Sequence, residues 1–206
     1  MRPGPLTAAC KRVIDVAGAL CGLLILSPVI FGTALAVRWT MGSPVLFRQE
    51  RAGLNGRPFI LFKFRTMLVS QSAEIDPSTD AGRLTRIGRI LRITSLDELP
   101  QLWNVLKGEM SLVGPRPLLM EYLPYYTARQ SKRHLMRPGI TGLAQIKGRN
   151  AVTWEQKFLW DLVYVEHWSI SLDLRILLAT IAKVIKREGI SRQGHVTTEK
   201  FGAERR

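Results

Sequence analysis

The chain has 206 residues, a formal net charge of +14 and a sequence pI of about 10.6. This length suits one domain with a core, or one domain plus a membrane element, and leaves little room for two compact domains. Such a positive charge points to nucleic acid, an anionic membrane surface or a phosphorylated substrate as a partner. The two cysteines, Cys10 and Cys21, exclude a disulfide framework and are expected to be small buried side chains.

A long apolar run near the amino end predicts contact with a membrane. From Val16 to Val37 no residue is charged, and at about 1.5 Å per helical residue the run can reach across a hydrocarbon core. Ser27-Pro28 stands in its middle, where the proline removes a backbone hydrogen bond and bends the helix. The hydroxyl of Ser27 can bond back to an earlier carbonyl, which partly satisfies the broken backbone in lipid.

The charges that flank this run predict its topology. Lys11 and Arg12 precede it and Arg38 follows it, so the positive-inside rule places both flanks on the cytoplasmic side. This favours a re-entrant membrane hairpin over residues 1–40, followed by a cytosolic domain over residues 41–206. A kinked transmembrane helix is the alternative. Asp15, at the edge of the run, is expected to have a cationic partner such as Arg12.

Two strands are predicted next, at Val45 to Gln49 and Pro58 to Met67, and the Gly- and Asn-containing segment between them favours a β-hairpin. Alternation in the second strand puts Lys63 and Arg65 on the face opposite its phenylalanines. This cationic face can look into a cleft or simply be solvated.

A basic amphipathic helix is predicted from Arg83 to Arg92, with an arginine at every third position and apolar side chains on the other half of its surface. Such a helix can lie in the headgroup layer of a membrane. The alternative is a helix packed on a soluble core with a solvated cationic face.

An acidic pair, Asp97-Glu98, follows this basic stretch and is the main candidate for chemistry. Arginine and lysine neutralise phosphoryl oxygens, while a carboxylate can hold a divalent cation or attack phosphorus. The alternative is helix capping, because Ser95 and Glu98 have the spacing of a capping box and Pro100 is tolerated in a first turn. The helix that follows should end near Lys107-Gly108.

Further turns and helices follow the acidic pair. In Gly114-Pro115-Arg116-Pro117 two prolines preset the direction of one arginine, as a diphosphate clamp or a plain turn. The Gly-rich turn that ends at Gln145 can approach a nucleotide or simply connect two elements. Helices are predicted at Trp154 to Trp168, with a Thr153 and Gln156 cap, and at Leu174 to Arg187. The three histidines lack metal-ligand spacing.

At the level of the whole chain, the sequence resembles the bacterial sugar transferases, the monotopic polyprenyl-phosphate phosphoglycosyl transferases of the small single-domain type. The resemblance covers nearly the entire sequence. The matching motifs are Lys11-Arg12, Asp15, Ser27-Pro28, Lys63-Phe64-Arg65-Thr66-Met67, Ser95-Leu96-Asp97-Glu98-Leu99, Gly114-Pro115-Arg116-Pro117, Pro138-Gly139-Ile140-Thr141-Gly142 and the tail from Gly194 to Phe201.

The resemblance implies an α+β, mainly helical fold with a re-entrant hairpin, interfacial amphipathic helices and a small β-hairpin in a cytosolic catalytic domain. It implies transfer of a sugar phosphate from a UDP-sugar to polyprenyl phosphate, with release of UMP and with Mg²⁺ as cofactor. Asp97 would be the nucleophile, Glu98 would assist, and both would hold the metal. The implied substrate-binding residues are Lys63, Arg65, Arg92, Arg116, Gln145, Arg149 and Asp161.

The resemblance also implies a location at the cytoplasmic face of a bacterial inner membrane, with membrane lipid but no nucleic acid as a partner. A nucleic-acid-binding protein and a non-catalytic membrane scaffold are the rival classes. The first predicts an affinity that falls steeply with salt and needs no lipid, and the second predicts no nucleotide turnover. The tail favours UDP-N,N'-diacetylbacillosamine or another N-acetylated sugar as donor.

Overall fold

The computed structural model describes residues 4–69, 80–148, 153–186 and 201. Its helices are α1 (Pro5–Ile25), α2 (Ser27–Met41), α3 (Asp80–Arg83), α4 (Arg86–Thr94), α5 (Gln101–Lys107), α6 (Ala128–Ser131), α7 (Leu143–Gly148), α8 (Trp154–Glu166) and α9 (Ile170–Lys186). Its strands are β1 (Leu46–Ala52), β2 (Pro58–Phe64), β3 (Ser111–Val113) and β4 (Gly139–Thr141). The predicted α+β, mainly helical class with a small β-hairpin is confirmed.

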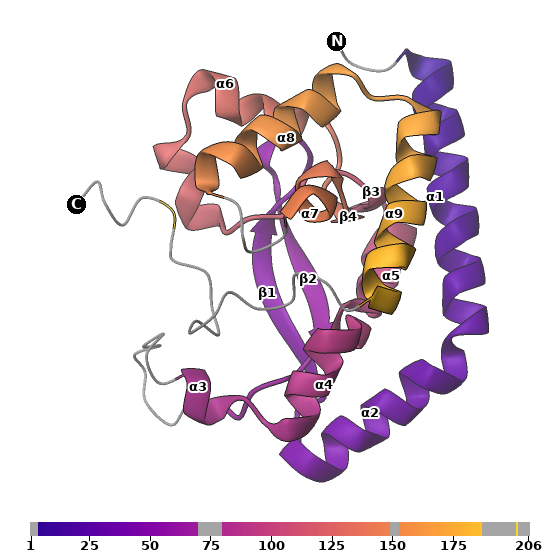
Figure 1. Ribbon diagram of the computed structural model, residues 1–206, viewed down its shortest axis with the longest axis vertical. Helices are drawn as coiled ribbons and strands as arrows, with labels where there is room; N and C mark the ends of the chain where they lie inside the picture. The colour runs from indigo at the N-terminus through magenta and orange to yellow at the C-terminus, as the bar shows by residue number, and fades with distance from the viewer. Residues whose placement is uncertain (1–3, 70–79, 149–152, 187–200, 202–206) are drawn as a thin grey trace.

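The first two helices form one bent unit along the edge of the molecule (Figure 1). The helical path breaks at Leu26, and the axes of α1 and α2 meet at 63°. Ser27 Oγ donates to the Leu24 carbonyl at 2.8 Å. Both the bend and the hydroxyl bond were expected from Ser27-Pro28, because proline cannot donate to the preceding turn.

Large apolar side chains cover the outer face of this unit. Leu24, Ile25 and Phe31 are 73%, 76% and 66% exposed. Cys10 and Cys21 are also exposed free thiols, so their predicted burial is wrong: α1 buries only the stripe that faces the rest of the protein. No single helix among the described residues is long and apolar enough to cross a bilayer, and α1 and α2 meet that requirement only as a bent pair.

Polar side chains on the inner stripe of α1 fix it to the rest of the fold. Lys11 Nζ pairs with Asp173 of α9 at 2.6 Å. Asp15 accepts hydrogen bonds from Ser111 Oγ and Leu112 N, both at 2.9 Å. The prediction of a cationic partner for Asp15 is therefore wrong as far as the described residues go. A hydroxyl and a backbone amide of β3 donate to the carboxylate instead.

The predicted β-hairpin is confirmed, with strand bounds that differ from the sequence prediction. β1 runs on to Ala52 and β2 ends at Phe64. The strands pair antiparallel with Gln49 opposite Leu61, and directly paired residues share a face. Gln49 and Arg51 therefore lie on the same face as Leu61 and Lys63. Leu61 is 2% exposed, so this face looks inward.

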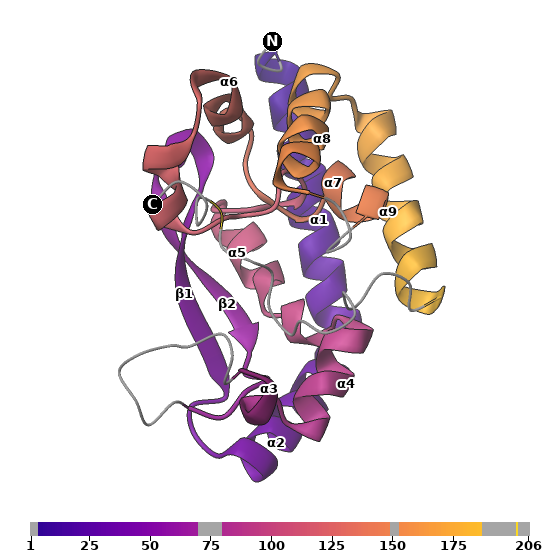
Figure 2. The same ribbon diagram turned by 60° about the vertical axis from the view of Figure 1, so that its left-hand side comes forward.

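The predicted helix from Arg83 to Arg92 is wrong at its amino end. α3 ends at Arg83, and α4 begins only at Arg86, after Thr85 caps it by accepting from Gly88 N at 2.9 Å. Gly88 lies against the Thr66 backbone so closely that a Cβ would come within 1.8 Å of the Thr66 carbonyl oxygen. The close approach packs α4 beside the end of β2, and Figure 2 shows α4 next to α2.

The remaining helices follow the sequence prediction with shifted ends. α5 stops at Lys107, and Gly108 closes it with φ 83°. The Thr153 and Gln156 capping box starts α8, which ends at Glu166, and α9 begins at Ile170 rather than at Leu174. β3 pairs with β4 in parallel, which places the chain after Val113 beside the turn after Thr141.

Candidate functional site

The acidic pair lies on η3 (Leu96–Glu98), a 3-10 turn between α4 and α5. Ser95 ends α4 in the left-handed region, at φ 58° and ψ 17°, and its side chain makes no capping hydrogen bond. The capping-box alternative for Ser95 and Glu98 is therefore wrong, because a capping residue needs an extended backbone. The turn carries Asp97 inward, 8% exposed, and leaves the Glu98 side chain available for other contacts.

Two cations from distant segments meet at Glu98. Lys63 Nζ of β2 lies 2.6 Å from Glu98 Oε1, and Arg116 Nη2 lies 3.0 Å from the same oxygen. Lys63 Nζ is also 3.9 Å from Asp97 Oδ2. The fold thus brings four of the predicted site residues together. No hydrogen bond joins the Asp97 carboxylate to any described side chain or amide.

The two neighbouring carboxyl groups have opposite pKa shifts. Burial raises the pKa of Asp97 to about 6, and the charge of Glu98 adds to this, against the opposing effects of Lys63, Arg116 and Arg92. Burial also acts to raise the pKa of Glu98, but the charges and hydrogen bonds of Lys63 and Arg116 outweigh it and lower the pKa to about 2. Glu98 therefore stays negatively charged near neutral pH, whereas Asp97 titrates at about pH 6.

The loop that holds Arg116 is fixed from behind. The Arg116 carbonyl accepts a 2.6 Å hydrogen bond from Arg133 Nη2. Arg133 is 2% exposed, and its Nη2 also lies 2.7 Å from Asp161 Oδ2. Gly114 is required in the loop because a Cβ there would come within 2.3 Å of the Arg137 carbonyl oxygen. The direction of Arg116 is thus set by its prolines and by a buried ion pair.

Arg92 and Arg65, two more of the predicted cations, make different contacts. Arg92 Nε donates to Thr66 Oγ1 at 3.1 Å, and its charge acts on Asp97. Arg65 follows the last residue of β2 and so leaves the strand alternation. Its guanidinium donates to the carbonyls of Met41, Gly42 and Ser43 at the end of α2. The structure places Arg65 as a support for α2, and its role toward substrate stays a prediction.

The last three predicted site residues do not join the acidic pair through any described contact. Gln145 Nε2 donates to the Ile140 carbonyl at 3.2 Å, and its Oε1 is buried without a partner. Asp161 lies under the Arg116 loop and binds Arg133. Arg149 lies outside the described residues. Their substrate-binding roles stay predictions.

Two arginines of this region were missed by the sequence prediction. Arg133 supports the Arg116 loop, and Arg51 of β1 donates through Nη1 to the Pro117 carbonyl at 3.4 Å. Arg51 could have been found from the hairpin alternation, because it shares the inward face of Lys63. Arg133 carries no comparable signal, since it lies in a four-residue 3-10 helix, η5 (Lys132–Leu135), that has no predictive periodicity.

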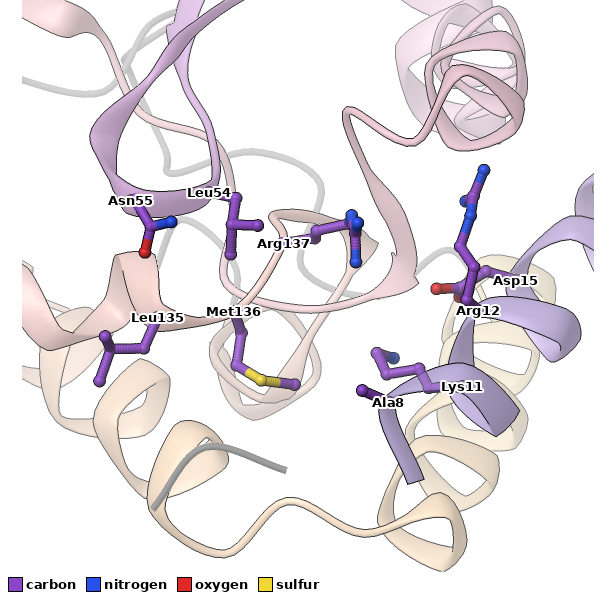
Figure 3. A pocket seen from close by; sticks show the side chains of 9 residues that line it. All are labelled: Ala8, Lys11, Arg12, Asp15, Leu54, Asn55, Leu135, Met136 and Arg137. Atoms are coloured by element: carbon purple, nitrogen blue, oxygen red, sulfur yellow. The ribbon is translucent and has the colours of Figure 1, made fainter. Parts of the chain in front are cut away.

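The acidic pair precedes the amino end of α5, and a cavity of about 200 Å³ lies near the carboxyl end of the same helix (Figure 3). Lys11 and Arg12 of α1 line it, together with Arg137 and the tip of the hairpin. Arg12 donates to the Val105 and Leu106 carbonyls, and Arg137 Nε donates to the Gly108 carbonyl at 2.8 Å. These arginines bind the carbonyls at the carboxyl end of α5, which favours cations there.

The acidic pair offers a binding mode for Mg²⁺ that needs few protein ligands. The described residues contain no cluster of three or more His, Cys, Asp or Glu that could hold a metal by itself. Mg²⁺ usually binds one or two carboxylates together with substrate phosphates and water. Asp97 and Glu98 fit that donor set, because Asp97 has no competing hydrogen bond and Lys63 and Arg116 contact only one of the two oxygens of Glu98.

A buried carboxylate of raised pKa among lysine and arginine side chains is an arrangement found in group-transfer sites for phosphate-bearing ligands. Comparison with known proteins agrees with this class. The profile of the bacterial sugar transferase family matches residues 6–187, so the chain belongs to that family.

Similar proteins include the uncharacterized sugar transferase EpsL of Bacillus subtilis, which is 53% identical over 93% of this chain and 95% of that protein. The UDP-glucose:undecaprenyl-phosphate glucose-1-phosphate transferase of Caulobacter vibrioides is 42% identical over 90% of this chain and 75% of its own length. The enzyme of the same name from Escherichia coli is 42% identical over 84% of this chain, which covers 39% of that longer protein.

Proposed function

We propose that this protein transfers a sugar 1-phosphate from a UDP-sugar to a polyprenyl phosphate and releases UMP, as the first membrane step of glycoconjugate biosynthesis. The observation that carries the proposal is the buried Asp97 carboxylate, whose pKa is raised to about 6 beside the fixed charge of Glu98. The names of the Caulobacter and Escherichia relatives support the same donor and acceptor classes. Neither a membrane scaffold nor a nucleic-acid-binding protein requires such a pair.

Asp97 is the nucleophile of the first step. Its carboxylate oxygen bonds to the phosphorus that carries the sugar, the bond from that phosphorus to the UMP oxygen breaks, and UMP leaves with the electron pair. An oxygen of the polyprenyl phosphate then bonds to the same phosphorus and displaces Asp97. Two displacements replace one difficult transfer between two anionic substrates.

The raised pKa of Asp97 suits this exchange. An ordinary aspartate has a pKa of about 3.9, so it would be a far better leaving group than a phosphate monoester, whose second pKa is about 6. Burial brings the pKa of Asp97 to about 6 and so matches it to UMP. The group is still largely ionised at pH 7, and the phosphoryl group can move from UMP to Asp97 without a steep uphill step.

Glu98 acts by holding charge in place. A carboxylate with a pKa of about 2 is a poor proton acceptor, which supports a role in orienting Lys63, Arg116 and the metal over a role as base. Asp97 and Glu98 would hold Mg²⁺, which would supply neutralisation of the phosphoryl oxygens. Lys63 and Arg116 bind those oxygens from two sides, and Arg92 adds positive charge near Asp97.

A position at the cytoplasmic face of the bacterial inner membrane fits these substrates, because the donor is soluble and the acceptor phosphate lies at headgroup depth. The bent α1–α2 pair enters one leaflet with both ends on the same side. Ile90 of α4 and Trp103 of α5, on the helices that flank the acidic pair, are 51% and 55% exposed. Such side chains can rest on the lipid surface beside the site.

The activity test uses protein in nanodiscs with undecaprenyl phosphate, Mg²⁺ and a panel of UDP-sugars, and it measures UMP release. The panel contains UDP-glucose, UDP-galactose and UDP-N,N'-diacetylbacillosamine, because the sugar is still only a prediction. Intact mass after incubation with donor alone should show a phosphosugar adduct on the wild type and none on Asp97→Asn. Folded protein that releases no UMP with any donor would remove the proposal.

The topology test uses a membrane-impermeant maleimide on oriented vesicles. The native Cys10 reports the amino flank in a Cys21→Ala background, and Thr40→Cys reports the other flank after both native cysteines are replaced. A re-entrant pair labels both positions from the cytoplasmic side. Labelling from opposite sides would instead support the kinked transmembrane alternative.

A further inference from the structure

Arg51 stands against the loop that carries Arg116. The hairpin register turns it to the inward face that also carries Lys63. Its Nη1 donates to the Pro117 carbonyl at 3.4 Å, a long bond, and its Nη2 donates to Gln49 Oε1. The guanidinium of Arg51 therefore reaches the Arg116 loop from the hairpin side, while Arg133 holds that loop from behind.

Arg51 lies close to carboxylates but pairs directly with none of them among the described residues. Among the described residues it forms no ion pair, and its Nε is buried without a hydrogen-bond partner. Burial, and next the positive charge of Arg116, lower the pKa of Arg51 to about 10, although Tyr122, Glu121 and Glu98 act in the opposite direction. The like charges of Arg51 and Arg116 thus act on one another, and Arg51 reaches the backbone of the residue after Arg116, while Glu98 is already paired to Lys63 and Arg116.

Like charges held together in a partly buried site are characteristic of an anion-binding site, because the ligand removes their repulsion. Each guanidinium presents a planar fork that can bond two oxygens of one phosphate. A diphosphate offers enough oxygens for both forks, and the prolines around Arg116 with the buried Arg133–Asp161 pair fix one of the forks in advance.

We propose that Arg51 is a substrate-binding residue that holds the diphosphate of the nucleotide-sugar donor together with Arg116. The inference rests on the proposed function and adds one residue of the hairpin to its donor site. Arg51 contributes to binding of the soluble donor and not to binding of the lipid phosphate. It does not take part in the covalent step.

Titration calorimetry with UDP, UMP and uridine tests this proposal without turnover. Arg51→Gln should weaken UDP binding by about 10- to 100-fold, the usual effect of losing hydrogen bonds from a charged group. Binding of uridine should not change, and the KM for undecaprenyl phosphate should stay at the wild-type value. Arg51→Lys keeps the charge but lacks the planar fork, so its affinity for UDP should lie between that of the wild type and that of Arg51→Gln.

Arg48→Gln is the matched control. Arg48 is on the opposite face of the same strand, exposed, with its guanidinium carbon 5.7 Å from the Phe62 ring centre. It loses the same charge and should bind UDP like the wild type. Melting curves without ligand should show that Arg51→Gln and Arg48→Gln are both folded, and the same concentration of UDP should raise the melting temperature of Arg51→Gln less than that of the wild type or of Arg48→Gln.

The inference is overturned if Arg51→Gln binds UDP as tightly as Arg48→Gln does. It is also overturned if the affinities of Arg51→Gln for uridine and for UDP fall by the same factor. Failure of the proposed function looks different: the wild type itself would then bind no UDP and release no UMP.

Discussion

The two ends of α5 are both surrounded by basic side chains, and they use them in opposite ways. At the carboxyl end, Arg12 and Arg137 donate to backbone carbonyls and stabilise the helix. At the amino end, Lys63 and Arg116 converge on Glu98, and Asp97 is left without a hydrogen bond. Arg12 and Arg137, which are bonded to the helix end, have a structural role. Lys63 and Arg116 are bonded to Glu98 next to a carboxylate without a hydrogen bond, so they can still bind a ligand.

The largest difference between the two ends should appear when one carboxylate is removed from each. Asp97→Asn should lower UMP release by about 10⁴-fold or more, because the nucleophile is lost. It should also raise the free energy of unfolding at pH 8 by about 1–3 kcal/mol, since the folded state no longer buries a charged group whose pKa is raised. Turnover and urea denaturation measure the two effects.

Asp15→Asn is the control at the other end of α5. It disturbs the bonds to Ser111 and Leu112, so it should lower the free energy of unfolding by about 1–3 kcal/mol and leave turnover per folded molecule unchanged. A variant at Asp97 that keeps full turnover would contradict the assignment of the nucleophile.

Arginine substitutions should separate the ends in the same way, with a smaller effect on activity. Arg116→Gln should reduce kcat/KM by about 100-fold because a charged fork is lost from the site. Arg12→Gln should leave kcat/KM intact and lower the free energy of unfolding by about 1–3 kcal/mol, because two carbonyls of α5 lose their donor. Equal loss of activity in both variants would show that the ends are not distinct.

The pH dependence of adduct formation should report Asp97. Its pKa of about 6 lies above the ordinary value of 3.8, so the protonated form gains population as pH falls through 6, and the rate should drop about tenfold per pH unit below that. The UMP burst without acceptor is the right measurement, because the lipid phosphate titrates in the same range. A rate that stays flat down to pH 4.5 would contradict the raised pKa.

The stability contributed by the pair should change with pH in two opposite steps. Asp97, with a folded pKa above the unfolded one, favours the folded state less as it ionises above about pH 4 and up to 6. Glu98, lowered from 4.5 to about 2, contributes stability above pH 4.5 that is lost as pH falls toward 2. Unfolding of Asp97→Asn against pH isolates the second step.

The smallest expected effect concerns the break before α4. Thr85→Ala removes the hydroxyl that accepts from Gly88 N and should lower the free energy of unfolding by about 1 kcal/mol. Thr85→Ser keeps the hydroxyl and serves as its control. If both variants unfold like the wild type, the cap does not set the start of α4.

Sequence patterns predicted the elements that depend on local chemistry. The bend at Ser27-Pro28, the hairpin and the box at Thr153 and Gln156 each follow from a few adjacent residues. The prediction of one helix from Arg83 to Arg92 was wrong because Leu84 pairs with Met67 in an isolated β-bridge, a contact between segments separated in the chain. The bounds of domains 1–40 and 41–206 stay a prediction.

The site residues also divide into those that local sequence patterns predicted and those whose contacts depend on the tertiary structure. The acidic pair and the basic character around it are visible in the printed chain, and so is the rigid presentation of Arg116 between two prolines. Sequence patterns could not distinguish Arg65, which binds the end of α2, from Lys63, which binds Glu98. Nor could they show that Asp161 holds Arg133 beneath the Arg116 loop.

The sequence by itself determined that this protein has a broken apolar helix, a cationic hairpin and a carboxylate pair followed by a short helix, because periodicity, proline and glycine act over a few residues. Only the tertiary structure decided which cations meet the carboxylates, and with what effect. Burial and charge at a distance of a few ångströms set the pKa of Asp97 and Glu98 in opposite directions. Those distances exist only after β2, η3 and the Arg116 loop have packed together.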